Sequence, residues 1–188
     1  MGLLTDDIAA FTQVAAPSEK PAPTQLDIIL KNCIDKHNRR ITDANAVIEM
    51  PPSLPVIHGY SQMLSLLFHN LLSNALLFHK PGVPPKIRIT YASTRDGDLP
   101  GHKLARAGVS YHNIAFQDNG VGFEPEYSEK IFGMFQRLHT QDAAYKGTGM
   151  GLAICKKVAE AHHGFIIADS VPGTGATFSC YLQDIHLG

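Results

Sequence analysis

Cysteines, long apolar runs and a targeting signal are scarce or missing in this sequence. The three cysteines, Cys33, Cys155 and Cys180, are widely spaced and form no C-x-x-C pair. This pattern argues against a disulfide framework or a zinc site and favours a reducing compartment. No apolar run reaches the roughly 18 residues of a membrane helix, and the opening MGLLTDD is acidic where a signal peptide is basic. We therefore expect a soluble, cytoplasmic chain without membrane contact, which leaves open a membrane anchor elsewhere in a parent protein.

An excess of charge of either sign is also absent. The 16 lysines and arginines nearly balance the 17 acidic residues, for a net charge of -1, and no block of like charge interrupts the mixture. A nucleic-acid-binding protein driven by a basic surface is therefore excluded. With 44% apolar and 18% charged residues, the composition is that of a folded globular protein. A length of 188 residues suits one domain, or one domain with an appendage.

Periodicity divides the chain into a short N-terminal helix and a larger domain. Apolar residues recur at helical spacing within residues 1–15. Three prolines within 17–23 then predict a linker, because proline denies hydrogen bonds to helices and strands. Helical spacing resumes over residues 25–40 and opens the larger domain.

The larger domain combines helices with strands joined mostly by hairpins. We expect a long helix with Ser61 as its N-cap, a long polar hairpin connection at 94–108 and a flexible stretch at 136–147. The expected helices are 60–78, a short one near 126–135, and 149–162, and the expected strands are 46–50, 56–59, 86–93, 109–118, 165–171 and 176–182. This order predicts a mixed sheet with helices on one face, a two-layer α/β sandwich.

Three glycine clusters are candidates for ligand contacts, at residues 118–122, 147–151 and 173–175. Each alone is typical of a turn, and a plain hairpin turn explains 173–175 as well as a functional role does. The middle cluster is more specific, because it directly precedes a predicted helix. Free backbone N–H groups and the positive end of the helix dipole favour an anion there. The spacing matches neither the P-loop nor the dinucleotide motif.

Two asparagines lie on one stripe of the long predicted helix. Asn70, Asn74 and Leu77 fall at positions i, i+4 and i+7, beside an apolar stripe. A buried asparagine without partners costs roughly 1–3 kcal/mol, so two at this spacing are harder to explain as structural amides than one. Amide oxygens suit Mg²⁺ that is shared with the phosphates of a nucleotide. Asp118, by contrast, could on its own be a residue that begins a turn.

Taken together and in order, five segments resemble the conserved boxes of the GHKL ATPases. They are NLLSNALLF (70–78), DNGVGF (118–123), IFGMF (131–135), GTGMGL (147–152) and GTGATF (173–178). The sequence between these boxes is similar to sensor histidine kinases, and the resemblance spans about residues 24–184. It implies a catalytic, ATP-binding domain with the Bergerat fold, and ATP and Mg²⁺ as cofactors.

The resemblance also implies a role for each box. Asp118 would accept a hydrogen bond from the adenine amino group, and Thr177 would support Asp118 through water. Asn74 with Asn70 would hold Mg²⁺, and residues 136–147 would form an ATP lid. Asn70 and Arg137 are the implied catalytic residues. The implied nucleotide contacts are Asn70, Asn74, Phe78, Asp118, Gly120, Gly122, Phe132, Phe135, Arg137, Gly147, Thr148, Gly149, Met150, Gly151, Leu152 and Thr177.

The sequence departs from the family pattern at two places in the first box. Leu77 stands where a phosphate-contacting lysine is usual, and Lys80 and Lys146 are the candidate substitutes, although neither lies on the asparagine stripe. Hydrolytic members of the family place a glutamate base where this chain has Asn70. The absence of that base argues against activation of water and for transfer to a presented side chain.

The phosphoacceptor histidine that such kinases need is not among the ten histidines of the chain. Residues 1–16 instead resemble the end of the second helix of the hairpin that carries it. The expected organisation is therefore a hairpin remnant at 1–16, a linker at 17–23 and the catalytic domain at 24–188, a fragment that is not self-sufficient. The expected partners are the hairpin of the full-length kinase and a response regulator. Two alternatives remain open, a hydrolytic ATPase and a nucleotide-binding pseudokinase.

Overall fold

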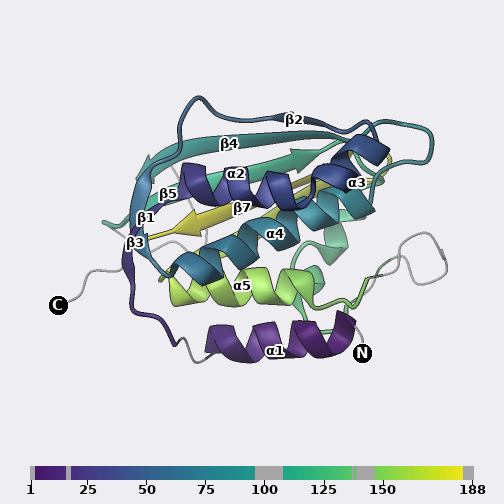
Figure 1. The fold of residues 1–188 in the computed structure, drawn as a ribbon. Coiled ribbons are helices and arrows are strands. Elements are labelled where there is room, and N and C mark those ends of the chain that lie inside the picture. The colour runs from purple at the N-terminus through teal and green to yellow at the C-terminus, as the bar shows by residue number, and fades with distance from the viewer. Residues whose placement is uncertain (1–2, 16–17, 96–107, 137, 139–146, 184–188) are drawn as a thin grey trace.

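The computed structural model describes residues 3–15, 18–95, 108–136, 138 and 147–183. The helices are α1 (Leu3–Ala15), α2 (Leu26–Lys36), α3 (Asn38–Asp43), α4 (Ser61–Leu77) and α5 (Gly151–Ala161), with the 3-10 turns η2 (Pro125–Tyr127) and η3 (Lys130–Phe132). The strands are β1 (Ala22–Gln25), β2 (Val47–Glu49), β3 (Val56–Gly59), β4 (Lys86–Arg95), β5 (Ser110–Asp118), β6 (Phe165–Val171) and β7 (Gly175–Leu182). Figure 1 shows their arrangement.

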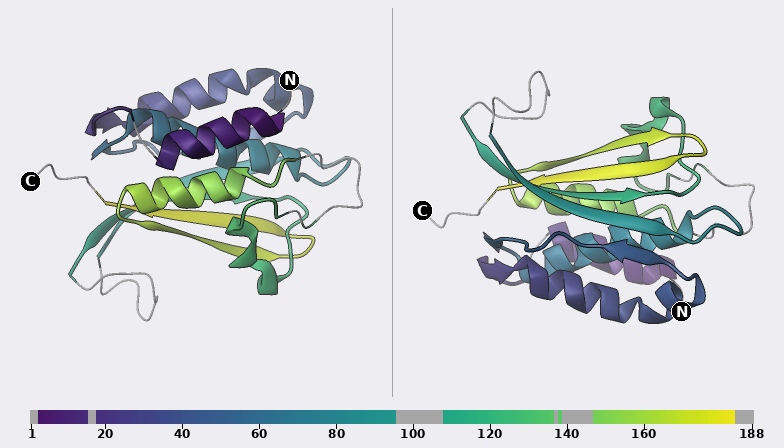
Figure 2. Two further views of the ribbon diagram at one scale, coloured as in Figure 1. Left: turned by 90° about the horizontal axis from the view of Figure 1, so that it is seen from below. Right: turned by 90° about the horizontal axis from the view of Figure 1, so that it is seen from above.

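A mixed five-stranded sheet forms one layer of the molecule, in the order β2-β4-β5-β7-β6. β2 runs parallel to β4, and the other neighbours are antiparallel. Alternate residues such as Ile87, Ile89 and Phe116 are buried on one face, as strand alternation requires. Helices α2, α4 and α5 cover that face (Figures 1 and 2). The predicted two-layer α/β sandwich with helices on one face is confirmed.

Helix α4 lies at the centre of the helical layer because its apolar residues are buried along most of its length. Phe68, which is fully buried, packs against Phe116 of β5 with ring centroids 5.6 Å apart. The predicted N-cap was wrong: Tyr60 occupies that position, and its side chain makes no capping hydrogen bond. The Gln62 N–H instead donates to Glu19 Oε1 at 2.8 Å, so a carboxylate from the preceding segment stabilises the start of α4.

Strand β1 differs from the sequence expectation, since Ala22 and Pro23 fall within the predicted linker. The strand pairs with β3 in a separate two-stranded sheet, with Pro23 opposite His58. Proline is tolerated in such a strand because only one side of it has a pairing partner. The chain is therefore anchored to the domain already from Ala22 onward.

The remaining differences lie around the expected turns and loops. The predicted short helix at 126–135 is two separate 3-10 turns, η2 and η3. Pro125 begins the first turn and extended Gly133 ends the second. Most of the expected hairpin connection at 94–108 and of the segment at 136–147 lies outside the described residues.

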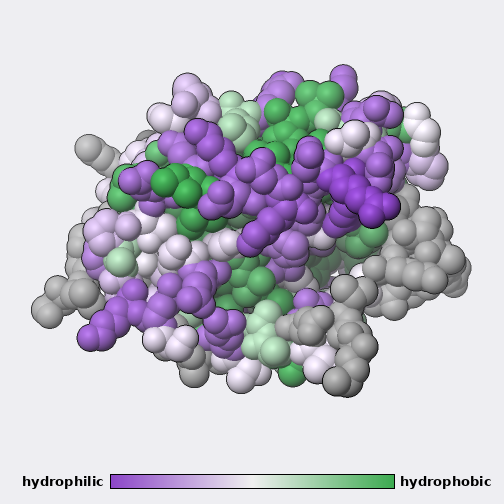
Figure 3. Space-filling view, in the orientation of Figure 1, coloured by the Kyte–Doolittle hydropathy of each residue, from purple (hydrophilic) through white to green (hydrophobic). Residues whose placement is uncertain are grey.

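Helix α1 lies along α5 (Figures 1 and 2), and its Val14 is buried in the main core. Within the part of the chain that the structure describes, no helix has the length and apolar character to cross a membrane. Figure 3 shows hydrophilic side chains over most of the helical face, with apolar ones in separate patches.

Candidate functional site

A cleft of about 260 Å³ opens between α4, the loop after β5 and the turn before α5. Segments from across the sequence form its walls. The described lining residues are Asp7, His69, Asn70, Ser73, Asn74, Leu77, Phe78, Asp118, Val121, Gly122, Phe123, Ile131, Gln136, Leu138, Gly147, Thr148, Gly149, Gly151, Leu152, Ala176 and Phe178. All five boxes of the sequence resemblance therefore contribute residues to one cavity.

The polar stripe of α4 faces this cleft. Asn70, Asn74 and Leu77 all line it, whereas Leu67 and Leu71 on the neighbouring stripe are buried in the core. The separation follows from helical periodicity, which places i, i+4 and i+7 on one side. The two asparagine side chains are thus available to a ligand, while the apolar side of α4 packs in the core and fixes the helix in place.

Asn70 also sets the distance between α4 and α5. Its Nδ2 donates to the Leu66 carbonyl at 2.9 Å, which directs Oδ1 toward the start of α5. A Cβ placed at position 151 would lie 2.9 Å from that oxygen, closer than such a contact allows. Gly151 is therefore the residue type that lets the asparagine stripe approach the beginning of α5.

The turn before α5 presents an arrangement suited to an anion. The first N–H groups of a helix have no partner within the helix, and its dipole is positive there. No side chain caps α5 at Met150. The Thr148 hydroxyl accepts a hydrogen bond from the Met150 N–H at 3.3 Å and donates one to the carboxylate of Asp7. Met150 itself points into the core, with 2% of its surface exposed.

Asp118 lies at the end of β5, where the chain turns away from the sheet. Its Oδ1 accepts the Gly120 N–H at 2.8 Å and the Ala176 N–H at 3.2 Å. Burial raises the pKa of the carboxyl group, while these two bonds and the nearby charge of Lys80 oppose the rise. Because both protein bonds use Oδ1, Oδ2 is the oxygen available to a ligand in the cleft.

The loop after Asp118 is held against the turn between β6 and β7. The Gly173 N–H donates to the Val121 carbonyl at 2.7 Å. Gly122 has φ of +65°, and a Cβ there would lie 2.3 Å from the Val171 carbonyl, so no larger residue fits. The glycine cluster at 173–175 thus supports the loop after Asp118 on the side away from the cleft and does not line the cleft.

The two ends of the cleft are separated along α4. Asn70 lies beside Gly151 at one end, and the Phe78 carbonyl accepts the Val121 N–H near Asp118 at the other. Eight residues of helix span about 12 Å, which suits an elongated ligand. Lys80 lies at the Asp118 end, where its Nζ donates to the Gly173 carbonyl at 2.9 Å. In this structure it does not lie beside the turn before α5.

Several residues of the predicted set do not line the cleft. Phe132 is buried in the core, Phe135 is 57% exposed with φ of +61°, and Gly120 and Thr177 support the site through the backbone. The Ala176 N–H bonds Asp118 directly, and support of Asp118 by Thr177 through water stays a prediction. Arg137 and Lys146 lie outside the described residues.

The lining also contains residues that sequence reasoning missed. Asp7 comes from α1, 141 positions from its partner Thr148, and His69 lies on α4 directly before Asn70. His69 stacks on the buried His37 with ring centroids 4.7 Å apart. The helical spacing of residues 1–15 could have placed Asp7 on a face of α1, but no local pattern could have shown which element that face meets.

The charge of the described lining does not suit a polyanion by itself. It includes the carboxylates of Asp7 and Asp118 and neither lysine nor arginine. Among the described residues there is also no group of three or more His, Cys, Asp or Glu side chains that could hold a metal alone. A phosphate-bearing ligand therefore fits this lining best together with a cation that the asparagine amides and the ligand share.

This sheet, its single helical layer and the cleft between α4 and α5 define an ATPase domain of the Bergerat type. Residues 59–185 match the family of histidine kinase-, DNA gyrase B-, and HSP90-like ATPases, and the chain belongs to that family. Its relatives include sensor histidine kinases, and the chain is similar to the part of them that carries this ATPase domain.

Among those relatives is the phytochrome-like protein Cph1 of Synechocystis, 38% identical over 95% of this chain. The sensor-like histidine kinase SenX3 of Mycobacterium tuberculosis is 31% identical over 97% of it. The chain covers 22% and 42% of these two proteins, respectively, so it matches only part of each.

Solved structures show the same fold at lower identity. Full-length ShkA in complex with AMPPNP superposes with a TM-score of 0.71 at 21% identity, covering 97% of this chain and 36% of that one. The catalytic domain of the histidine kinase ThkA gives a TM-score of 0.67 at 21% identity and covers 88% of this chain and 97% of that one.

Proposed function

We propose that the cleft binds Mg-ATP, with adenine at Asp118 and the triphosphate at the turn formed by residues 147–152. The observation that carries the proposal is the geometry of Asp118. Backbone N–H groups hold its Oδ1, and its second oxygen remains as an acceptor for the adenine amino group. Gly120 and Gly122 let the loop after Asp118 pack closely against the Phe78 and Val171 carbonyls, and Phe78 forms the adjoining wall of the cleft. The unpaired N–H groups that begin α5 are about 12 Å away, within reach of the phosphates.

Asn74, together with Asn70, would hold the Mg²⁺ in this proposal. Both amides line the cleft beside the start of α5, and amide oxygens suit a hard cation that keeps waters and binds phosphate. When bound, Mg²⁺ neutralises phosphate charge that the described lining does not offset. Residues 136–147 would act as the lid, with Phe132 and Phe135 at its base and Arg137 near the γ-phosphate.

The proposed reaction transfers the γ-phosphoryl group to a histidine on a helical hairpin upstream of the catalytic domain. An imidazole nitrogen attacks phosphorus, the bond to the ADP oxygen breaks, and the imidazole proton passes to solvent. Asn70 at the hydrolytic base position favours this acceptor over water, because an amide does not take up a proton. Residues 1–16 would then be the hairpin remnant, 17–23 the linker and 24–188 the catalytic domain. A response regulator would receive the phosphoryl group.

The test combines this chain with a separately produced phosphoacceptor hairpin and Mg-ATP. We expect acid-labile phosphohistidine on the hairpin. The Asp118→Asn variant, which replaces an acceptor oxygen near adenine, should lower nucleotide affinity at least tenfold. ATP binding without any label transfer would contradict the kinase proposal. Steady phosphate release without a hairpin would favour a hydrolytic ATPase.

A nucleotide-binding module without transfer is the second candidate, and Leu77 favours it. Leu77 lines the cleft at the position where relatives carry a phosphate-contacting lysine, and Lys80 lies at the Asp118 end. The same experiment separates the two candidates, since a pseudokinase would bind the nucleotide but leave the hairpin unlabelled.

A further inference from the structure

Helix α1 brings an acidic side chain into the nucleotide cleft. Asp7 lines the cleft and accepts a hydrogen bond from the Thr148 hydroxyl, in the turn that precedes α5. Figure 1 shows that the N-terminal end of α1 lies near this turn. A carboxylate therefore lies at the place where the proposed function requires phosphate.

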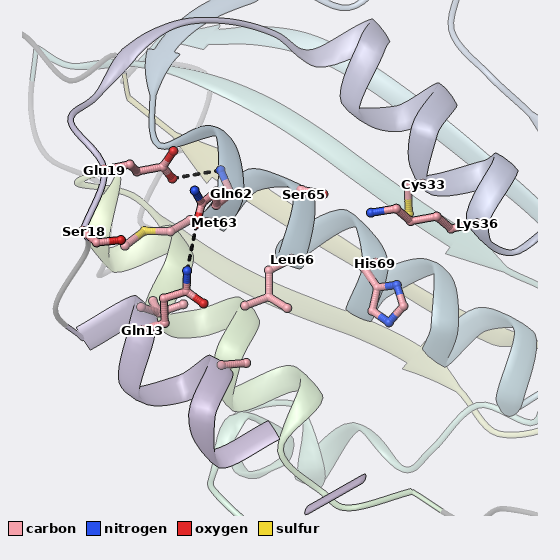
Figure 4. A pocket seen from close by; sticks show the side chains of 12 residues that line it. Gln13, Ser18, Glu19, Cys33, Lys36, Gln62, Met63, Ser65, Leu66 and His69 are labelled. Carbon is pink, nitrogen blue, oxygen red and sulfur yellow. Dashed lines mark hydrogen bonds between the residues drawn. The ribbon is translucent and has the colours of Figure 1, made fainter. Parts of the chain in front are cut away.

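The position of Asp7 follows from contacts along the rest of α1. Val14 is 5% exposed and joins the main core. Gln13 Nε2 donates to Gln62 Oε1 of α4 at 2.8 Å, and Glu19 binds the Gln62 N–H just beyond the helix (Figure 4). These contacts dock the helix at its C-terminal end and so direct Asp7 toward Thr148.

The docking is incomplete, because a cavity of about 230 Å³ remains between α1, α2 and α4 (Figure 4). Its walls include Ala10, Cys33 and Leu66. Unfilled space means that apolar side chains lack contacts they would have in a close-packed core. The side of α1 that faces α2 and α4 is therefore only partly packed, and the helix is held mainly by Val14, by its contact with α5 and by the bonds at its C-terminal end.

Asp7 and a phosphate group need the same donor. A threonine hydroxyl carries a single proton, and Thr148 donates it to Asp7 here. A phosphate oxygen bound at the start of α5 could accept that proton only if Thr148 released Asp7, and it would be repelled by the carboxylate. The two anions therefore compete for one position.

We propose that Asp7 is an internal anion that occupies the phosphate position, so that docking of α1 and binding of the nucleotide phosphates oppose each other. The inference rests on the proposed function of the cleft. Coupling of this kind is reciprocal: displacement of α1 raises nucleotide affinity, and bound nucleotide loosens α1. The docked helix is an autoinhibitory contact. The loss of nucleotide affinity that it causes grows with the number of phosphates on the ligand.

The decisive variant is Asp7→Asn, which keeps the shape of the side chain and removes its charge. Asp35→Asn is the matched control, since Asp35 is exposed on α2 and lines neither cavity. Calorimetry with Mg²⁺ and AMPPNP, ADP or AMP measures each affinity. We expect Asp7→Asn to bind AMPPNP roughly three- to thirtyfold more tightly, with a smaller gain for ADP and none for AMP. Asp35→Asn should match the unchanged protein throughout.

Other results would overturn the inference and leave the proposed function intact. One is equal AMPPNP affinity in the unchanged protein and in Asp7→Asn, and another is a gain of Asp7→Asn for AMP as large as that for AMPPNP. A third is weaker AMPPNP binding by Asp7→Asn with a higher Mg²⁺ requirement, which would make Asp7 a metal ligand. If neither protein binds any of the nucleotides, the proposed function fails first and the inference with it. Hydrogen exchange gives an independent readout: AMPPNP should speed exchange of the α1 amides in the unchanged protein, and slower exchange would contradict the competition.

Discussion

His162 is a buried histidine whose two ring nitrogens are both used by the backbone. Its Nδ1–H donates to the Val158 carbonyl at 2.8 Å, and its Nε2 accepts the Tyr60 N–H at 3.1 Å. Burial lowers the pKa of the imidazole. A proton on Nε2 would leave no acceptor for Tyr60, so the ring serves the fold only in its neutral form. The structure therefore gives this residue a packing role.

This arrangement predicts a loss of stability in mild acid. An unfolded histidine titrates near pH 6.5, whereas the folded pKa is lower. The unfolded state therefore binds more protons, and the stability present above pH 6.5 falls as the pH drops toward the folded pKa. Between pH 7 and pH 5 we expect His162 to account for at most about 2 kcal/mol of lost unfolding free energy, the limit that the unfolded pKa sets.

Urea unfolding at both pH values checks this prediction. His162→Gln should be less stable at pH 7 but should lose less on acidification, and exposed His163→Gln is the matched control. Burial also lowers the pKa of His37, to about 4, and of His69, so part of the acid sensitivity will persist in every variant. An unchanged pH dependence in His162→Gln would show that this ring does not titrate on unfolding.

At the scale of elements, the contact between α4 and α5 depends on one side chain and one missing Cβ. Gly151→Ala would bring a methyl group to 2.9 Å from Asn70 Oδ1. We expect Gly151→Ala to lower the unfolding free energy by about 1–3 kcal/mol. The same substitution made in the Asn70→Ala variant should lose much less, because the clashing side chain is gone. A double-mutant cycle should therefore give a coupling of about 0.5–3 kcal/mol.

Asn74→Ala provides the control for that cycle. The three nearest atoms to a Cβ at position 151 all belong to Asn70, so Gly151→Ala and Asn74→Ala should be additive within about 0.5 kcal/mol. Additivity in the Asn70 cycle as well would mean that the two helices do not meet through this pair.

Elements with a strong local pattern could be predicted from sequence, and elements set by distant contacts could not. The apolar stripes of α4 and α5 and the alternation of β4 and β5 identified those elements to within about two residues. β1 was missed because Pro23 opposes a strand locally, whereas the pairing of β1 with β3 joins residues that are 31 to 37 positions apart. In the cleft, the boxes were found, but Asp7 was not, because its meeting with Thr148 depends on how α1 docks.

At the scale of the whole molecule, stability is not uniform. Of the described side chains of α1, Val14 is buried in the core and Ala10 and Phe11 are partly buried against it, which is a small share of the core that joins the sheet to α4. We expect α1 to open separately, since regions with few buried contacts open below the global unfolding free energy.

Val14→Ala tests this expectation. It should speed hydrogen exchange of the α1 amides about tenfold or more and leave the global urea midpoint nearly unchanged. Ile8→Ala, at an exposed position on the same helix, is the control and should change neither. A lower global midpoint in Val14→Ala would instead mean that α1 unfolds together with the domain.

The early anchoring of the chain at β1 has a consequence for how α1 moves. Only residues 16–21 separate the end of α1 from the paired Ala22, a tether that reaches about 20 Å at most. A displaced helix thus stays at an effective local concentration in the millimolar range. The return of the helix is intramolecular. The fraction of docked helix therefore depends on the ligand concentration and not on the protein concentration.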